Sequence, residues 1–438
     1  MPDAALARDA RRVFDAAVRA VQAPALLDRL DLEALAGRPL AAFARVTVVG
    51  AGKASVPLAG ALEARAGVPV EGVVVVPEGY AATVPASMPR PRRIRVVEAG
   101  HPVPTASSAE AARQALALAH AAGPDDLVIA LVSGGGSALW ALPPVGVALD
   151  DVRETTRLLL GAGVPIDGVN AVRKHLSRIG GGRLALAAAP ARVLALVLSD
   201  VPGDDPAVIA SGPTVPDPTT FADALAVLHK FGLEDRVPRP VRQHLDAGAA
   251  GDRPETPDAD HAAFRTAAAH VIGTNGTALD AAAREAERLG YRVEAVERRV
   301  EGEAREVGRQ VTEAALGMPR DRPTCRLWGG ETTVTLTGTG RGGRNQEVAL
   351  SAALALDGAE ATVVVLSAGT DGVDGPTDAA GGWASPGTAG RVRQSGLDPA
   401  ARLADNDAHA ALDAAGALVR TGPTHTNVAD VAVALAAL

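Results

Sequence analysis

The chain has 438 residues, of which 47% are hydrophobic and 21% charged, so its length and composition predict a globular protein with two domains. Aromatic residues make up only 2% and the formal net charge is −8, which argues against nucleic acid or an anionic membrane as a partner. The single cysteine, Cys325, and an N-terminus without an apolar signal segment predict a cytoplasmic protein without intrachain disulfides. Glycines and prolines interrupt the longest uncharged run, residues 127–149, so we expect no membrane span there.

Short apolar runs alternate with helical patterns in the first half of the chain. We expect helices within residues 8–35, from the GAGKAS loop to Ala66 and over Ser107–Ala122, and strands at Val46–Val49, Val73–Val76, Ile94–Val97, Leu127–Val132 and Arg192–Leu198. This order predicts an α/β domain with a mostly parallel, doubly wound Rossmann-like sheet and helices on both faces. Because such sheets bind ligands beyond the carboxyl ends of their strands, the residues that follow each strand are the first site candidates.

A polar segment rich in Gly, Pro and Asp, Asp246–Asp260, is predicted to link two domains, residues 1–250 and 260–438. The second half again alternates, which predicts a second α/β domain. Its expected strands are His270–Ile272, Arg292–Val296, Arg326–Trp328, Glu331–Thr339 and Thr362–Leu366, and its expected helices are Gly276–Leu289, Glu301–Leu316, Asn345–Leu356 and Pro399–Ala415.

The first glycine loop, VVGAGKAS, follows the first expected strand. Thr47 and Ala54 stand where a P-loop needs other residues, which excludes that motif. Ser55 replaces the last small residue of a dinucleotide fingerprint, a near miss that leaves a Rossmann interpretation open, with Glu78 as the ribose contact. Lys53 at a helix start opposes the helix dipole, so an anionic ligand beside it would be stabilising.

The second glycine loop, SGGGS, offers consecutive unhindered N–H groups and two hydroxyls, which suits an anion. A tight strand–helix turn needed only for packing would look the same. Ser137 does not stand in a G-x-S-x-G elbow, so a serine hydrolase is not expected.

Aspartates follow two further strands. Asp200 comes directly after an apolar strand, the setting of a general base or a metal-linked carboxylate. Asp371, Asp374 and Asp378 lie in the loop SAGTDGVDGPTDAAGG, whose carboxylates would suit Mg²⁺ held with phosphates, although Asp also favours turns for its own hydrogen bonds.

Basic residues supply the remaining candidates. Gly342, Gly343 and Arg344 form a turn before a helix, where a guanidinium fork suits phosphate or carboxylate. Arg173 belongs to the cluster Arg173–His175, which is either a solvated helix face or the pocket for an anionic substrate. His101 and His425 are more often structural than catalytic in such turns.

The motifs GAGKAS, GHPVPT, SGGGSAL, NAVRKHLS, LSDVPGDDPAVIASGPT, GGETTVTLTGTGRGGRNQE and SAGTDGVDGPTDAAGG resemble the glycerate 2-kinase family, whose C-terminal part is the MOFRL domain and whose members are often labelled hydroxypyruvate reductases. The resemblance implies ATP-dependent phosphorylation of D-glycerate to 2-phosphoglycerate with Mg²⁺, in a cleft between two α/β domains. It places the proposed catalytic residues at Lys53, Asp200 and Arg344.

The complete set of predicted contacts joins these two lines of reasoning. Substrate and nucleotide are expected to contact Gly52, Ser55, His101, Ser133, Gly134, Gly135, Gly136, Ser137, Arg173, Ser211, Glu331, Gly342, Gly343, Asn345 and Asp371. The candidate metal ligands are Asp200, Asp371 and Asp374. The sequence leaves open whether the protein forms a homodimer. An NAD(P)H-dependent hydroxypyruvate reductase and a non-enzymatic sugar-acid-binding protein are the alternatives.

Overall fold

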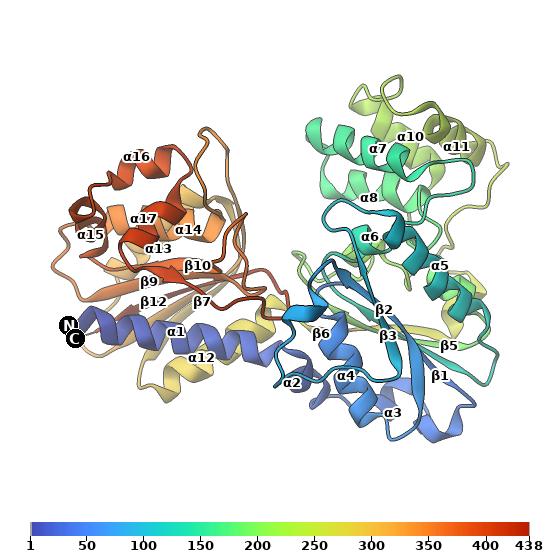
Figure 1. The fold of residues 1–438 in the computed structure, drawn as a ribbon, viewed down its shortest axis with the longest axis horizontal. Coiled ribbons are helices and arrows are strands. Elements are labelled where there is room, and N and C mark those ends of the chain that lie inside the picture. Colours follow the sequence, from blue (N-terminus) through green and yellow to red (C-terminus); the bar gives the residue numbers. More distant parts are fainter. Residues whose placement is uncertain (1, 438) are drawn as a thin grey trace. The chain divides into compact units, whose positions relative to one another are not determined.

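The computed structural model describes residues 2–437 and divides the chain into two compact units (Figure 1). The central unit runs from Leu26 to Ile272, and the terminal unit joins the segment that ends at Ala25 to the chain from Gly273 onward. Among the described residues, no helix has the length and apolar character that crossing a membrane would require.

The central unit is built on a six-stranded sheet of order β3-β2-β1-β4-β5-β6. The pairings β2–β3, β1–β2, β1–β4 and β4–β5 are all parallel, which confirms the predicted doubly wound sheet. Its strands are β1 (Val46–Ala51), β2 (Val70–Pro77), β3 (Ile94–Ala99), β4 (Leu127–Val132), β5 (Arg192–Leu198) and β6 (Ala267–Gly273).

The strand order reverses between β1 and β4. In register, Ala51 lies opposite Val132, so the loops that follow these two strands begin side by side. Both strands are buried along their whole length, since helices cover both faces of the sheet. This reversal is the topological switch point, where doubly wound sheets bind their ligands.

Helices cover the sheet and also extend beyond it. Val75 packs with α5, whereas its neighbour Val76 packs with Val56 of α4, so these two helices lie on opposite faces. Four helices, α7, α8, α10 and α11, form a separate cluster with its own apolar core, here called the helical cap (Figure 1). The α-helices of this unit are α3 (Leu32–Ala36), α4 (Ser55–Arg65), α5 (Ala106–His120), α6 (Gly136–Leu139), α7 (Leu149–Gly161), α8 (Ile166–His175), α9 (Arg183–Ala188), α10 (Phe221–Lys230) and α11 (Arg239–Ala249), and α2 (Ala23–Leu27) contains the boundary.

The terminal unit holds a mixed sheet of order β11-β10-β9-β12-β8-β7. Its β7–β8 pairing is parallel and its other described pairings are antiparallel. The strands are β7 (Arg292–Glu303), β8 (Thr324–Thr333), β9 (Val363–Gly369), β10 (Gly381–Ala384), β11 (Leu418–Val419) and β12 (Asp430–Ala436). The helices are α1 (Pro2–Ala20), α12 (Asn275–Arg288), α13 (Ala304–Leu316), α14 (Arg344–Ala355), α15 (Thr388–Gln394), α16 (Pro399–Ala404) and α17 (Ala408–Ala414).

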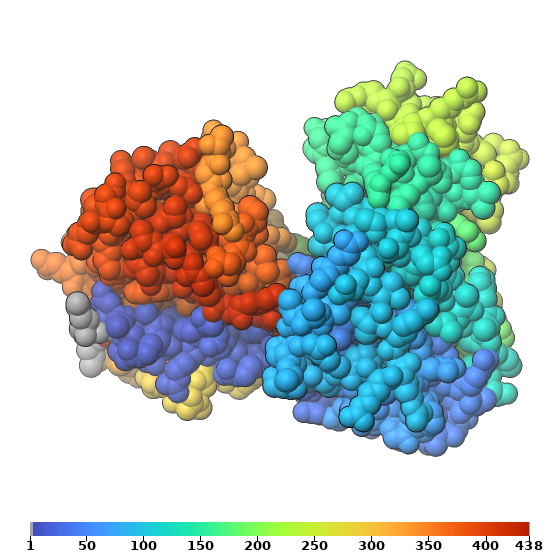
Figure 2. All heavy atoms as spheres, in the orientation of Figure 1, coloured from blue at the N-terminus to red at the C-terminus, as the bar shows by residue number. Residues whose placement is uncertain are grey.

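These units differ from the predicted domains 1–250 and 260–438. Helix α1 belongs to the terminal unit, because it packs on α12, β9 and β12, and Figure 2 shows its blue atoms against the red C-terminal segments. The segment Asp246–Asp260 lies inside the central unit, since it precedes β6, the sixth strand of the first sheet. Its composition reflects solvent exposure at a loop rather than a boundary.

One predicted strand is wrong in its extent. Glu331–Thr339 was expected to be a strand, but β8 ends at Thr333 and an irregular loop follows. Backbone N–H groups in this loop donate to side chains instead of a neighbouring strand: Thr335 donates to Glu303 at 3.1 Å, and Thr337 donates to Asn406 at 2.8 Å. Side-chain acceptors replace the backbone hydrogen bonds of a neighbouring strand here. The alternation of residue types in the sequence does not show this difference.

Candidate active site

The two glycine loops at the switch point pack directly against each other. Gly52 has φ +132°, and a Cβ there would lie 2.1 Å from the Ser133 Oγ, so only glycine allows this approach. The Lys53 N–H donates to the Gly134 carbonyl at 3.1 Å, and the Ala54 N–H donates to the Ser133 Oγ at 3.2 Å. With the Gly52 N–H on Val75 and the Ser55 N–H on Gly52, the N–H groups of this loop are all used inside the protein.

The second glycine loop differs from the first because two of its N–H groups are unpaired. Within residues 2–437, the N–H groups of Gly134 and Gly135 have no hydrogen-bond partner. Gly135 has φ +88°, and a Cβ there would lie 2.9 Å from the His101 Nε2. Two adjacent unpaired N–H groups beside an imidazole are suited to an anion, so the predicted anion site fits this loop better than the first.

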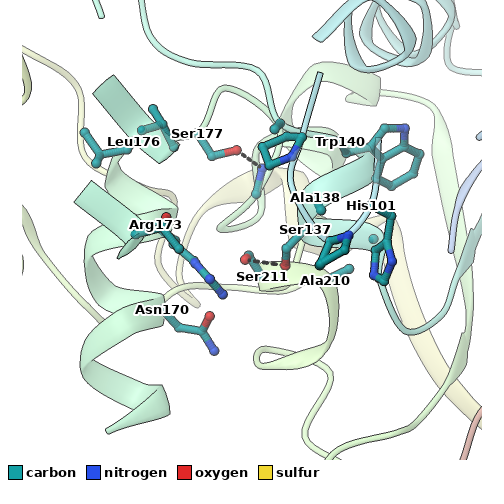
Figure 3. Close-up of a pocket in the computed structure, with 18 of the residues that line it drawn as sticks. His101, Ser137, Ala138, Trp140, Asn170, Arg173, Leu176, Ser177, Ala210 and Ser211 are labelled. Carbon is teal, nitrogen blue, oxygen red and sulfur yellow. Dashed lines mark hydrogen bonds between the residues drawn. The ribbon is translucent and has the colours of Figure 1, made fainter. Parts of the chain in front are cut away.

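A cavity of about 570 Å³ opens beside this second loop, lined by residues of the central unit (Figure 3). One of its walls is polar and brings together six predicted or newly found side chains: His101, Ser137, Asn170, Arg173, Asp200 and Ser211. The hydroxyls of Ser137 and Ser211 are hydrogen-bonded at 2.9 Å. Residues from strand ends, glycine loop and helical cap therefore converge on one space, as the switch point predicts.

Helix α8 of the helical cap turns Asn170 and Arg173 toward the serine pair (Figure 3). Asn170 is buried and its Nδ2 has no partner among the described residues. Burial lowers the pKa of Arg173, and no carboxylate among residues 2–437 pairs with its guanidinium. A desolvated cation without a counterion is costly, so this position is built for an anionic ligand.

The next two residues of the basic cluster have structural roles. Lys174 forms a buried ion pair with Asp217, Nζ to Oδ1 at 3.2 Å. The His175 Nδ1 lies 2.7 Å from the Ala171 carbonyl, and its Nε2 lies 3.1 Å from the Glu255 carboxylate. These contacts anchor α8, so the sequence cluster divides into one cavity residue and two anchoring residues.

Arg344 lies in the terminal unit and is held by two carboxylates. Its Nε and Nη2 donate to Asp430 at 2.6 and 2.9 Å, a bidentate pair, and its Nη1 lies 2.7 Å from Glu331. Burial acts to lower the pKa of Arg344, but the hydrogen bonds and charge of Asp430 outweigh it and raise the pKa above its ordinary value. Glu331 was predicted at the site; Asp430, at the start of β12, was missed because it follows no glycine loop.

Asp374 caps the helix that carries Arg344. Its two carboxylate oxygens accept from the backbone N–H groups of Asn345 and Gln346, at 3.1 and 2.9 Å, and from both side-chain amides. Burial raises the pKa of this carboxyl to about 6. With four donors bound, this carboxylate caps the start of α14, and its predicted metal role stays a prediction.

The remaining acidic and glycine candidates make local contacts within the terminal unit. Asp371 accepts from the Val373 N–H at 3.0 Å, and exposed Asp378 pairs with His409 and Arg420. Gly343 packs so closely that a Cβ would lie 2.4 Å from the Asp374 Cγ. Among the residues that the structure describes, no group of three or more His, Cys, Asp or Glu could hold a metal ion.

Other predicted residues lie apart from the cavity lining. Lys53 and Ser55 belong to the first loop and the start of α4, and buried Ser55 has an Oγ without a partner in residues 2–437. Asn345 donates its side chain to Asp374 and accepts from Ser367, and His425 is buried in the terminal unit. Their predicted ligand contacts stay predictions.

The central unit defines a class: a doubly wound α/β protein with a cation-lined cavity at its switch point. Comparison with known proteins places the chain within that class. Residues 9–246 match the family described as a domain of unknown function (DUF4147), and residues 324–430 match the MOFRL family. The chain is 41% identical over 397 residues to a glycerate 2-kinase of Pyrococcus horikoshii, which covers 89% of this chain and 87% of that protein.

Two further relatives agree over nearly the whole length. A protein of Agrobacterium vitis, named for a proposed hydroxypyruvate reductase activity, is 44% identical over 429 residues and covers 96% of this chain and 92% of its own. The crystal structure of a glycerate kinase from Thermotoga maritima matches with a TM-score of 0.85 at 38% identity, covering 99% of both chains. The chain belongs to the glycerate 2-kinase family, which confirms the resemblance of its motifs.

Proposed function

We propose that this protein is a D-glycerate 2-kinase, which transfers the γ-phosphoryl group of ATP to the 2-hydroxyl of D-glycerate and releases ADP. Its relatives that carry kinase names support this activity. The observation that carries the proposal within the structure is the cavity of the central unit, which is lined both by half-buried Arg173, without a carboxylate partner, and by Gly134 and Gly135, whose N–H groups are unpaired. These groups provide for two anions, as a kinase with a carboxylate substrate requires.

The hydrogen bonds of the first glycine loop weigh against the reductase alternative. A dinucleotide site places the pyrophosphate against the N–H groups of this loop and the following helix. Here the N–H groups of Gly52, Lys53, Ala54 and Ser55 already donate inside the protein. We therefore assign the first loop to packing and to presenting Lys53.

The acid is held, in this proposal, by helix α8. The Arg173 guanidinium and the Asn170 amide stand one turn apart on the same face and both point into the cavity (Figure 3). A carboxylate bound to them would neutralise the desolvated cation and satisfy the Asn170 Nδ2 in one contact. This arrangement would select a carboxylic acid over a neutral polyol.

The chemistry follows from charge and proton placement. Asp200 accepts the proton of the 2-hydroxyl; the hydroxyl oxygen then forms a bond to the γ-phosphorus, and the bond to the bridging oxygen of ADP breaks. Lys53 would neutralise the charge on the transferring group, and the same role for Arg344 stays a prediction that the family resemblance implies. Mg²⁺ would supply further neutralisation when bound with ATP, and its ligands stay the predictions made from the sequence.

The test is ³¹P NMR of the purified protein with ATP, Mg²⁺ and D-glycerate. We expect 2-phosphoglycerate and ADP to appear together, and Asp200→Asn to lower kcat by about 10²–10⁴ if it is the base. A 3-phosphoglycerate signal would contradict the regiochemistry. Oxidation of NADH by hydroxypyruvate, without any phosphorylated product, would establish the reductase instead.

Cytoplasmic location and a homodimer stay predictions. Sedimentation velocity of the purified protein would measure its mass in solution directly. Cell fractionation would locate it.

A further inference from the structure

Apolar side chains also line the central-unit cavity and have no role in the chemistry above; they are here called the apolar wall. Val103, Trp140, Leu142, Leu160, Ile166 and Leu176 line it. Three of these rim the mouth and are strongly exposed: Val103 at 60%, Leu160 at 57% and Ile166 at 53%. They come from the loop after β3, the end of α7 and the start of α8, so separate parts of the chain converge to build one apolar surface. Exposed apolar surface that gathers around a cavity is typical of a ligand site.

D-glycerate has no apolar group large enough to contact this wall. The acid consists of a carboxylate and two hydroxyls on three carbons, and the polar wall already matches those groups. The cavity of about 570 Å³ lies within the range of roughly 300–1,000 Å³ that is usual for much larger ligands. The space must therefore accept something that is both larger and partly apolar.

Cations near this wall are already neutralised. Arg153 donates its Nε to the Pro104 carbonyl at 2.7 Å and pairs with Asp150, which ties α7 to the loop that carries Val103. Arg157 pairs with Glu154, Nη2 to Oε1 at 2.6 Å. The unpaired groups, Arg173 and the N–H groups of Gly134 and Gly135, lie on the polar side, so a triphosphate belongs there and an uncharged group belongs on the apolar side.

We propose that the apolar wall of this cavity, rimmed by Val103, Leu160 and Ile166, binds the adenine ring of ATP, with the phosphates directed to the Gly134–Gly136 loop. A planar heteroaromatic base attached to a phosphate chain has the same division into apolar and anionic ends as the cavity. The inference rests on the proposed kinase function, because it assigns a place to the second substrate. It separates the two substrates along the cavity: the acid at Asn170 and Arg173, and the base at the rim formed by Val103, Leu160 and Ile166.

The experiment is steady-state kinetics of Leu160→Asp and Ile166→Asp in the full-length protein, with Leu186→Asp as matched control. Leu186 lies on α9, is 39% exposed and does not line the cavity. A carboxylate at the rim should raise the KM for ATP roughly tenfold, since it removes apolar contact and repels the phosphates. The KM for D-glycerate should stay within about twofold, and the control should match the wild type.

Adenosine provides a second measurement that does not depend on turnover. It lacks phosphates, so protection of the wild-type protein against thermal unfolding by adenosine reports base binding alone. We expect protection of the wild type and of Leu186→Asp, and loss of it in Leu160→Asp.

Each contrary result has a distinct meaning. An unchanged KM for ATP in both aspartate variants, or a rise confined to the KM for D-glycerate, would overturn the adenine site while leaving the kinase function in place. Protection by ATP but not by adenosine would overturn it as well. A wild-type protein that forms no 2-phosphoglycerate would instead remove the proposed function, and the adenine assignment with it.

Discussion

Two half-buried arginines, one in each unit, stand in opposite electrostatic situations. Arg344 in the terminal unit has a bidentate partner in Asp430 and a second carboxylate in Glu331. Arg173 in the central unit has no carboxylate partner within residues 2–437, and burial lowers its pKa. The same residue type is therefore fixed by the protein in one unit and left for a ligand in the other.

The difference shows how one chain can use arginine for two tasks. A guanidinium held by carboxylates is oriented before any ligand arrives, which suits a group that must stabilise a short-lived charge at a defined position. A desolvated guanidinium without a partner instead gains its counterion when the ligand binds, which suits the capture of a stable anion. Substitutions should separate these tasks, because the first should affect kcat and the second KM.

The largest effect is expected for Arg344→Ala. Loss of a preorganised charge-stabilising group should lower kcat by about 10²–10³, and the carboxylate of Asp430 left without its partner should lower the free energy of unfolding by about 3 kcal/mol. Initial rates and urea unfolding of the same preparation measure both. Arg344→Lys keeps the charge but loses the fork, so it should recover only part of kcat.

A second substitution distinguishes catalysis from mere loss of stability. In Arg344→Ala with Asp430→Asn, the unpaired charge is gone, so the free energy of unfolding should recover while kcat stays low. Recovery of both together would show that Arg344 acts only by keeping the fold intact. A near-normal kcat in the single variant would exclude its catalytic role altogether.

The next effect is expected for Arg173→Met, which keeps the apolar stem and removes the charge. The KM for D-glycerate should rise about tenfold to a hundredfold, since a hydrogen-bonded ion contact to the carboxylate contributes roughly 1.5–3 kcal/mol, and kcat should change little. Arg113→Met on α5, whose guanidinium is exposed and pairs with Glu110, is the matched control.

Stability should respond to Arg173→Met in the opposite sense from Arg344→Ala. Because the variant removes a desolvated cation that has no partner, its free energy of unfolding should equal or exceed that of the wild type. A less stable variant with an unchanged KM would place Arg173 in the support of α8, together with Lys174, rather than in the acid site.

Much of this framework could be read from the chain itself. The alternation of apolar strands with helices predicted the doubly wound sheet, because buried parallel strands are continuous apolar runs. Strand ends followed by Ser133, Asp200 or a glycine loop predicted which residues converge, since parallel strands end at a common edge. These features are local in sequence, so a pattern of a few residues is enough to specify them.

Features that depend on distant partners were not predictable in this way. Helix α1 pairs with the terminal unit through contacts more than two hundred residues away, and its own periodicity only indicates that one face is buried. Asp430 pairs with Arg344, and Asp374, predicted as a metal ligand, accepts four hydrogen bonds from the start of α14; neither contact could be inferred from the sequence around the aspartate. The sequence shows that a carboxylate is present, but it does not show which distant donor or cation pairs with it.

The smallest effect is expected for Glu331→Gln, which probes the weaker of the two contacts to Arg344. The Glu331 side chain is 43% exposed, whereas that of Asp430 is 10% exposed, so solvent screens the first pair far more than the second. The variant should change the free energy of unfolding by less than about 1 kcal/mol and kcat by less than roughly threefold, because Asp430 alone still fixes the fork. A kcat that fell as far as in Arg344→Ala would mean that Glu331 itself contacts the substrate, as the sequence-based list of contacts predicts. Urea unfolding and initial rates across a range of ATP concentrations distinguish a structural role of Glu331 from a substrate contact. A structural contact would alter the free energy of unfolding, whereas a substrate contact would alter the KM or kcat alone.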